Sequence, residues 1–158
     1  MPDWGDLHFV DPPNLRHPAD FHGHVLIVRF WTEGCPRCRA SAATLSDWMR
    51  RYGNKGLEVV GIYLPKEKGD SVDDEAVRKA AHELGLEAEL AVDRDWSALR
   101  RLWEHGGRRF SVSVSLLVDR QGVVRAVHRG GYLTEERPAS REETRGFRQA
   151  MEHALGWT

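Results

Sequence analysis

The sequence predicts an α/β protein with a central mixed sheet between layers of helices. Near-continuous apolar runs at 25–31 and 57–64 are typical of interior strands that are covered on both faces. Helical periodicity follows each run, and turn residues join two short strands near the end of the chain. Strands joined through helices run parallel with right-handed crossovers, whereas the terminal hairpin adds antiparallel strands at one edge.

The first predicted strand and helix enclose the most informative part of the chain. The strand covers 25–31 and is apolar except for Arg29. Pro36 then occupies a position that a first helical turn tolerates, and Gly53 or Gly56 ends the helix. The apolar stripe of this helix consists of Ala40, Ala43, Thr44, Leu45, Trp48 and Met49.

The middle of the chain continues the alternation. A second strand covers 57–64, and a helix over 72–84 ends at Gly85. Residues 89–93 form a short strand. The apolar face of the next helix consists of Trp96, Leu99, Leu102 and Trp103, and Gly106 and Gly107 close that helix.

A hairpin and a helix complete the predicted domain. Strands at 111–118 and 123–128 flank the turn residues 119–122. Ser140 begins the last helix with Glu143 three positions later, which is a capping-box pattern. The buried face of this helix consists of Phe147, Met151 and Leu155.

This order of elements predicts a thioredoxin-like, three-layer α/β/α fold with a central mixed sheet and a C-terminal antiparallel hairpin. A chain of 158 residues suits a single domain with a sizeable core. We assign residues 25–158 to the thioredoxin-like domain and residues 1–24 to an N-terminal extension.

The charges of the chain nearly balance, with 23 Lys and Arg against 24 Asp and Glu. No long-range field therefore indicates nucleic acid or an anionic membrane as a partner. Residues 1–24 contain no apolar stretch like that of a signal peptide. We expect no membrane segment, and a cytoplasmic location if Met1 is the native start. After removal of a leader, the location would be periplasmic or extracytoplasmic. The oligomeric state stays open.

The only two cysteines, Cys35 and Cys38, enclose Pro36 and Arg37 at the turn from strand to helix. A disulfide over two intervening residues can form and break there with little backbone movement. The amides of a helix N-terminus and cations such as Arg37 and Arg39 stabilise a thiolate. The pattern predicts a redox-active dithiol with Cys35 as the accessible nucleophile.

Two other interpretations of the cysteines remain open. A Cys-x-x-Cys pair can form half of a zinc site, and His22-x-His24 could complete a Cys2His2 set. The pair can also be inert. Four further histidines lie on different predicted elements without ligand spacing, and we expect them to be surface or satisfied residues: His82, His105, His128 and His153. We assign no metal and no cofactor.

At this point the chain resembles a known family. Residues 25–38 resemble the active-site segment of the thioredoxin superfamily, in particular its TlpA/ResA-like and AhpC/TSA-type redoxin branch, and residues 23–31 resemble the entry strand of that branch. Leu116-Leu117-Val118-Asp119-Arg120-Gln121-Gly122 resembles the Phe-Leu-Ile-Asp-x-x-Gly segment of that branch. The resemblance extends over about residues 12–155.

The resemblance implies a thiol-disulfide oxidoreductase in which Cys35 attacks and Cys38 resolves. It implies a protein disulfide or dithiol as substrate and a second redox partner that reduces or oxidises the pair. The geometry agrees, because the first cysteine of such a turn meets solvent and the second points inward.

Several residues beside the cysteines depart from the family pattern. Gly34 replaces the usual Trp, so the turn lacks its hydrophobic neighbour and is freer, while Trp31 ends the strand. Arg29 occupies the position of a buried acid that helps to deprotonate the resolving cysteine. If Arg29 points at the site, it favours the thiolate; alternatively, it extends to solvent.

A further departure concerns the loop that presents backbone to the substrate in this family. Counting back from Gly122 places Ser113, preceded by Val112, where the family has a cis-proline. A cis bond before a non-proline residue costs about 3 to 4 kcal/mol, so we expect this peptide to be trans. Alternatively, the alignment is shifted and Ser113 is a plain loop residue.

Two alternative functions follow from these departures. Thr32-x-x-Cys35 matches half of the peroxiredoxin Pro-x-x-x-Thr-x-x-Cys motif, with Val28 in place of the proline, and indicates a thiol peroxidase. The other alternative is a redox-silent or metal-binding module on a thioredoxin fold. Its binding surface would use the tryptophans Trp4, Trp31, Trp96, Trp103 and Trp157.

Overall fold

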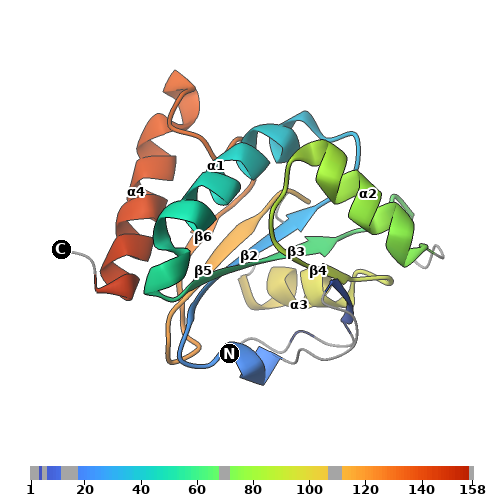
Figure 1. Ribbon diagram of the computed structural model, residues 1–158, viewed down its shortest axis with the longest axis horizontal. Coiled ribbons are helices and arrows are strands. Elements are labelled where there is room, and N and C mark those ends of the chain that lie inside the picture. The colour runs from blue at the N-terminus through green and yellow to red at the C-terminus, as the bar shows by residue number, and fades with distance from the viewer. Residues whose placement is uncertain (1–3, 5–6, 12–17, 68–71, 107–111, 157–158) are drawn as a thin grey trace.

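The structure, a computed structural model, describes residues 4, 7–11, 18–67, 72–106 and 112–156 and contains a six-stranded mixed sheet with helices on both faces (Figure 1). The strand order is β1-β4-β3-β2-β5-β6. The strands β2, β3 and β4 are mutually parallel, and β1 and β5 pair antiparallel with β4 and β2. The strands are β1 (His8–Asp11), β2 (Val25–Trp31), β3 (Leu57–Tyr63), β4 (Glu89–Val92), β5 (Ser115–Val118) and β6 (Val124–His128).

Helices cover both faces of this sheet. Figure 1 shows α1, α2 and α4 on one face and α3 on the other, which confirms the predicted three-layer fold. The helices are α1 (Pro36–Tyr52), α2 (Asp74–Leu84), α3 (Ser97–Gly106) and α4 (Pro138–Leu155), with short 3₁₀ turns η1 (Pro18–Phe21) and η2 (Gly53–Lys55). Among the described residues, no helix combines the length and apolarity needed to cross a bilayer.

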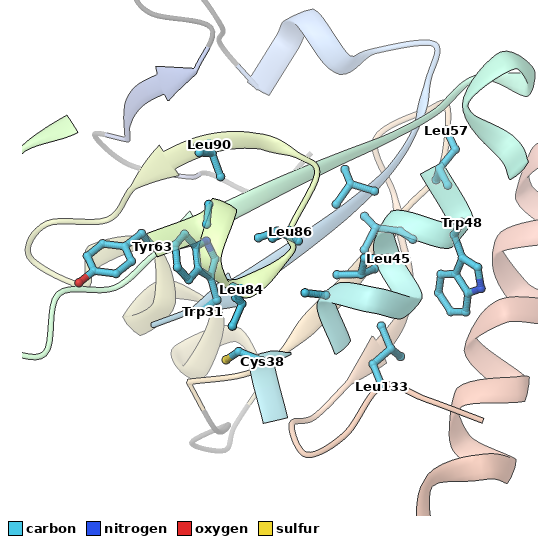
Figure 2. Packing of buried hydrophobic residues seen from close by; sticks show 14 of the residues in the cluster. Trp31, Cys38, Leu45, Trp48, Leu57, Tyr63, Leu84, Leu86, Leu90 and Leu133 are labelled. Carbon is cyan, nitrogen blue, oxygen red and sulfur yellow. The ribbon is translucent and has the colours of Figure 1, made fainter. Parts of the chain in front are cut away.

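The strand β2 divides its side chains between two apolar clusters. Ile27 and Trp31 pack under α1 and α2, whereas Val28 and Phe30 pack toward α3. Figure 2 shows the first cluster, in which Cys38 lies among the apolar side chains beneath α1. The first turn of α1 is therefore anchored in the core, and this anchoring fixes the position of the cysteine pair.

Part of the segment 1–24, which the sequence analysis sets apart as an extension, belongs to the sheet. In β1, His8 pairs with Val92 and Phe9 with Ala91 of β4, and both Trp4 and Phe9 are buried. The strand β1 is too short and too polar for an alternation of buried and exposed side chains to be recognised in the sequence. Gly107 and Ser111, where a predicted helix closes and the hairpin begins, lie outside the described residues.

The last helix begins earlier than the capping-box pattern predicts. It starts at Pro138, and Arg137 is the N-cap without a side-chain cap hydrogen bond. Ser140 lies within the helix, and its hydroxyl donates to the carbonyl of Thr134, which precedes the helix, at 2.7 Å. The capping-box prediction at Ser140 is therefore wrong, because proline at the first helical position fixes the start of the helix.

Candidate active site

The Cys-Pro-Arg-Cys segment forms the N-terminus of α1, directly after the loop that leaves β2. Cys35 is the N-cap, with an extended backbone at φ −95° and ψ 110°, and Pro36 is the first helical residue. The Cys35 carbonyl accepts the amides of Cys38 and Arg39 at 3.1 and 3.2 Å. The Sγ of Cys35 also accepts the Cys38 amide, at 3.2 Å. The first thiol thus takes the capping role that a serine or aspartate usually has.

The two cysteines are free and face one another. The Cys38 thiol donates to Cys35 Sγ with the sulfur atoms 2.6 Å apart, so a disulfide can form without rearrangement of the helix. Cys35 is partly exposed, whereas Cys38 is 1% exposed and packs in the cluster beneath α1 (Figure 2). Only the first sulfur is accessible to a large reagent.

Cys38 is held in its protonated form. Burial raises the pKa of the Cys38 thiol from an ordinary value of 9.0 to about 11, and the hydrogen bond to Cys35 adds to this rise. The charge of Arg29 and a hydrogen bond from the Thr32 backbone oppose it, because both stabilise the thiolate. At neutral pH, the buried cysteine therefore needs help to become a nucleophile.

Arg29 points toward the cysteines and does not reach solvent. It is 1% exposed in the middle of β2, and its Nη1 donates to the Ser115 hydroxyl at 3.0 Å. Burial lowers the pKa of the guanidinium, while the charge and hydrogen-bonding capacity of Cys38 and the charge of Cys35 raise it. Of the two orientations that the sequence left open, the structure has the inward one.

A buried histidine lies near Arg29, and the sequence analysis missed it. His128 is 1% exposed, and neither ring nitrogen has a hydrogen-bond partner within the described residues. Its Nε2 lies 3.7 Å from Glu143 Oε2, and its ring meets Phe147 edge-on at 6.4 Å. The expectation of a surface or satisfied histidine is wrong at this position. Burial, and secondly the charge of Arg29, lower the pKa of His128, whereas Glu143 raises it.

Ser113 lies just before β5, beside the end of β2. The next residue, Val114, accepts the Phe30 amide through its carbonyl at 3.0 Å, so the chain before β5 runs along the last residues of β2. Ser113 is buried and its hydroxyl accepts the Gly131 amide at 3.4 Å, while Val112 is half-buried. Its assignment to the substrate loop stays a prediction.

Gly34, directly before Cys35, has a left-handed backbone with φ +71°. An L-residue with a side chain is strained in this region, so the tryptophan that the family usually has here does not suit this turn. Trp31 is instead buried, with its ring edge-on to Tyr63 at 5.0 Å. The Tyr63 hydroxyl donates to Glu33 at 2.9 Å and ties the loop to β3.

The remaining predicted site residues surround the cysteines. Pro36 and Arg37 are exposed on the first turn of α1, and the Arg37 carbonyl accepts the Ser41 hydroxyl at 2.7 Å. Thr32 lies between β2 and the helix, and its Oγ1 is buried without a hydrogen-bond partner among the residues described.

The described part of the chain contains no group of three or more His, Cys, Asp and Glu side chains that could hold a metal ion. His24, one of the two histidines considered as zinc ligands, instead pairs with Glu58 at 3.0 Å. The structure therefore does not assemble the Cys2His2 set.

The sheet order and the position of the two thiols at the N-terminus of the first long helix define a dithiol protein of the thioredoxin fold. The sequence model of the AhpC/TSA family matches residues 15–127. Because this match spans more than half of the chain, the protein belongs to the AhpC/TSA family, as the sequence resemblance predicts.

Among curated proteins, the chain is similar to Protein DipZ of Mycobacterium tuberculosis and of Mycobacterium bovis. Each is 27% identical over 121 residues, which cover 77% of this chain. The match spans only 16% of the length of DipZ. The similarity therefore concerns one segment of a much longer protein.

Solved structures show the same fold. A candidate thiol:disulfide interchange protein DsbE from Chlorobium tepidum is 26% identical with a TM-score of 0.66, covering 87% of this chain and 84% of that one. A thiol-disulfide isomerase from Corynebacterium glutamicum is 20% identical with a TM-score of 0.69, covering 95% and 92%. A secreted disulfide oxidoreductase of Mycobacterium tuberculosis, homologous to Escherichia coli DsbE, is 17% identical with a TM-score of 0.59, covering 81% and 85%.

Proposed function

We propose that the protein is a thiol-disulfide oxidoreductase that uses Cys35 as the attacking thiolate and Cys38 as the resolving thiol. One observation carries the proposal: a partly exposed sulfur at the N-cap of α1 faces a buried sulfur one turn later, at 2.6 Å. The redox activity of the similar proteins supports the same class of reaction.

The proposed reaction has two exchange steps. The Cys35 thiolate attacks one sulfur of a substrate disulfide, and the other substrate sulfur departs as a thiolate. Cys38 then loses its proton to solvent and attacks Cys35 Sγ, which releases the second substrate thiolate. Two electrons pass from the protein to the substrate, and the Cys35–Cys38 disulfide forms. A separate redox partner restores the dithiol, and the same steps in reverse oxidise a substrate dithiol.

The substrate class and the compartment are part of this proposal. The accessible sulfur lies at the surface of α1 between exposed Pro36 and the loop at Gly34, where a protein disulfide can approach it. The similarity to a secreted disulfide oxidoreductase favours an extracytoplasmic location over the cytoplasmic one. Protein disulfides form and persist in such oxidising compartments, so substrates of this class occur there.

A thiol peroxidase is the second candidate, and one observation favours it. The buried, unpartnered Thr32 hydroxyl lies three residues before Cys35, in a chain of the AhpC/TSA family. In that reaction the Cys35 thiolate would attack one peroxide oxygen and become a sulfenic acid, and the other oxygen would leave as water or alcohol. Cys38 would then displace water and form the same disulfide.

The structure weakens the non-enzymatic alternative. Trp4 and Trp31 are buried, and the Trp96 Nε1 donates to the Pro65 carbonyl at 3.0 Å. Trp103 is partly buried against the core, and Trp157 lies outside the described residues. The described tryptophans therefore form core rather than a contiguous exposed aromatic surface.

Two measurements test the proposal: trapping of mixed disulfides with single-cysteine variants, and the rate of oxidation by hydrogen peroxide. We expect Cys38→Ser to accumulate a mixed disulfide with a model protein disulfide, and Cys35→Ser to form none. Hydrogen peroxide should oxidise the reduced wild type no faster than a free thiol. A mixed disulfide through Cys38 would overturn the assignment of the two roles. Rapid peroxide consumption that depends on Thr32 would establish the peroxidase instead.

A further inference from the structure

A row of polar side chains crosses the sheet beneath the cysteine pair. In the strand register, Arg29 of β2 lies opposite Ser115 of β5, and Ser115 lies opposite His128 of β6. All three are buried, and they lie on the face that α1 and α4 cover, because Ile27, Trp31 and Leu117 of the same strands pack there. This row places three polar side chains among strand residues that are mostly apolar on this face.

The guanidinium of Arg29, at one end of this row, lacks a full set of hydrogen-bond acceptors among the described residues. Ser115 takes one hydrogen bond from Nη1, but Nε and Nη2 of Arg29 have no hydrogen-bond partner of good geometry among the described residues. A guanidinium keeps its charge in proteins, and a buried charge is strongly unfavourable without an opposite charge. The serine hydroxyl and the uncharged His128 cannot supply one.

Cys38 is the group near Arg29 that can become an anion in a buried position. Both groups lie on the face of the sheet that α1 covers, because Cys38 packs in the same cluster as Ile27 and Trp31 on either side of Arg29. Their charges attract one another, and the charge of Cys35 also reaches the guanidinium. Cys38 otherwise faces Cys35 and the Thr32 backbone. At the far end of the row, His128 has Glu143 of α4 as an acidic neighbour, and that side chain is 56% exposed.

We propose that Arg29 is the electrostatic partner of the Cys38 thiolate and that Ser115 holds its guanidinium in place. This inference rests on the proposed function, because the thiolate forms in the resolving step. The Cys38 proton leaves to solvent, since an arginine already carries its full set of protons. The Cys38 thiolate then attacks Cys35 Sγ, and the departing substrate thiolate regains a proton from solvent. Activation of Cys38 thus comes from a buried positive charge rather than from a base.

The size of the effect follows from the charge and the exchange chemistry. An opposite charge within about 4 to 6 Å shifts a pKa by about one to three units. A higher pKa reduces the thiolate fraction but increases the nucleophilicity of each thiolate, with a Brønsted coefficient of about 0.4 to 0.5. Loss of the Arg29 charge should therefore slow the resolving step about 3- to 60-fold at neutral pH.

A single-turnover reaction of the reduced protein with an aromatic disulfide that releases a coloured thiolate tests the proposal. Attack by Cys35 releases the first coloured thiolate, and attack by Cys38 on the mixed disulfide releases the second. We expect Arg29→Met and the polar, neutral Arg29→Gln to slow the second release selectively. Arg29→Lys, which retains a charge with fewer donors, should recover part of the rate. Leu26→Met, on the opposite face of β2, is the matched control and should leave both releases unchanged.

The outcomes separate this inference from the proposed function. A second release that is as fast in a folded Arg29→Met or Arg29→Gln as in the wild type would overturn the role of Arg29. Equal slowing of the second release in all three Arg29 variants would also overturn it. A role in packing alone would slow the charged Arg29→Lys as much as the two neutral variants. The proposed function itself would be wrong if Cys35→Ser released the first coloured thiolate as fast as the wild type does.

Discussion

Cys38 lies directly beneath Cys35 in the first turn of α1, and its amide donates to the Cys35 sulfur at 3.2 Å. The upper sulfur is partly exposed and the lower one is 1% exposed. The same stacking lets the pair form a disulfide and gives its two members different accessibility. Most of the behaviour that we expect from the pair follows from this asymmetry.

The first prediction concerns alkylation of the reduced protein. We expect iodoacetamide at neutral pH to modify Cys35 before Cys38, because Cys38 is buried and burial raises its pKa to about 11. Mass spectrometry of peptides after short exposures measures the order. In denaturant the two cysteines should react at similar rates. Earlier modification of Cys38 in the folded protein would contradict the assignment of the nucleophile.

The second prediction concerns stability at alkaline pH. The pKa of Cys38 is about 11 in the folded protein and 9.0 for an ordinary thiol, so the folded state retains a proton that the unfolded state releases. The stabilisation is complete below about pH 9 and is lost as the pH rises toward about 11. We expect the reduced protein to lose up to roughly 3 kcal/mol of unfolding free energy over this range.

The oxidised protein is the control for this pH dependence, because its disulfide has no thiol proton. Urea denaturation of both forms at several alkaline pH values gives the difference in unfolding free energy. Groups other than the two cysteines that titrate in this range affect both forms alike and cancel in the difference. A constant difference between the two forms from pH 8 to about pH 11 would contradict the buried, protonated Cys38.

The third prediction is that reduction of the disulfide leaves the fold intact. The loop between Cys35 and Cys38 is short, and the loop-entropy relation gives about 2 kcal/mol for its closure. The sheet and its two apolar clusters do not depend on this link. Circular dichroism should therefore show the same spectrum in reductant, with a modest fall in the denaturation midpoint. A chelator should change neither, and unfolding by a chelator would instead indicate a structural metal.

The elements around the site were predictable because local signals agreed. An apolar run ends at Trp31, a proline follows Cys35, and the structure places β2 and α1 at these positions. The start of α4 was predicted wrongly because two local signals competed. Pro138 and Ser140 both suit a helix start, and the helix begins at the proline, while the Ser140 hydroxyl bonds the Thr134 carbonyl.

The electrostatics of the site could not be predicted from local pattern. Arg29 and His128 lie far apart in the chain, and only the strand register places both in one row with Ser115. A single charged residue in an apolar strand is compatible with either orientation, since its long side chain can extend to solvent. The burial of His128 depends on the way α4 folds back over β6, which places Glu143 and Phe147 against the ring.

The last prediction concerns the loop before β5. Ser113 lies beside the end of β2, and its hydroxyl accepts the Gly131 amide at 3.4 Å. We predict that it takes the place of the proline in the substrate loop of this family. We expect Ser113→Pro to increase the rate of exchange with a model protein disulfide severalfold, because proline fixes the backbone that would meet an extended substrate. Loss of the long hydrogen bond to Gly131 should lower stability by about 1 kcal/mol.

Ser113→Ala separates these two effects, because it removes the hydroxyl without restricting the backbone. Its stability should fall by a similar amount while its exchange rate stays at the wild-type value. Stopped-flow fluorescence gives the exchange rate, and urea denaturation gives the stability. A folded Ser113→Pro protein with an unchanged exchange rate would show that substrate does not contact this loop. An equal increase in Ser113→Ala would attribute the gain to loosening of the loop, and the predicted substrate contact would then be wrong.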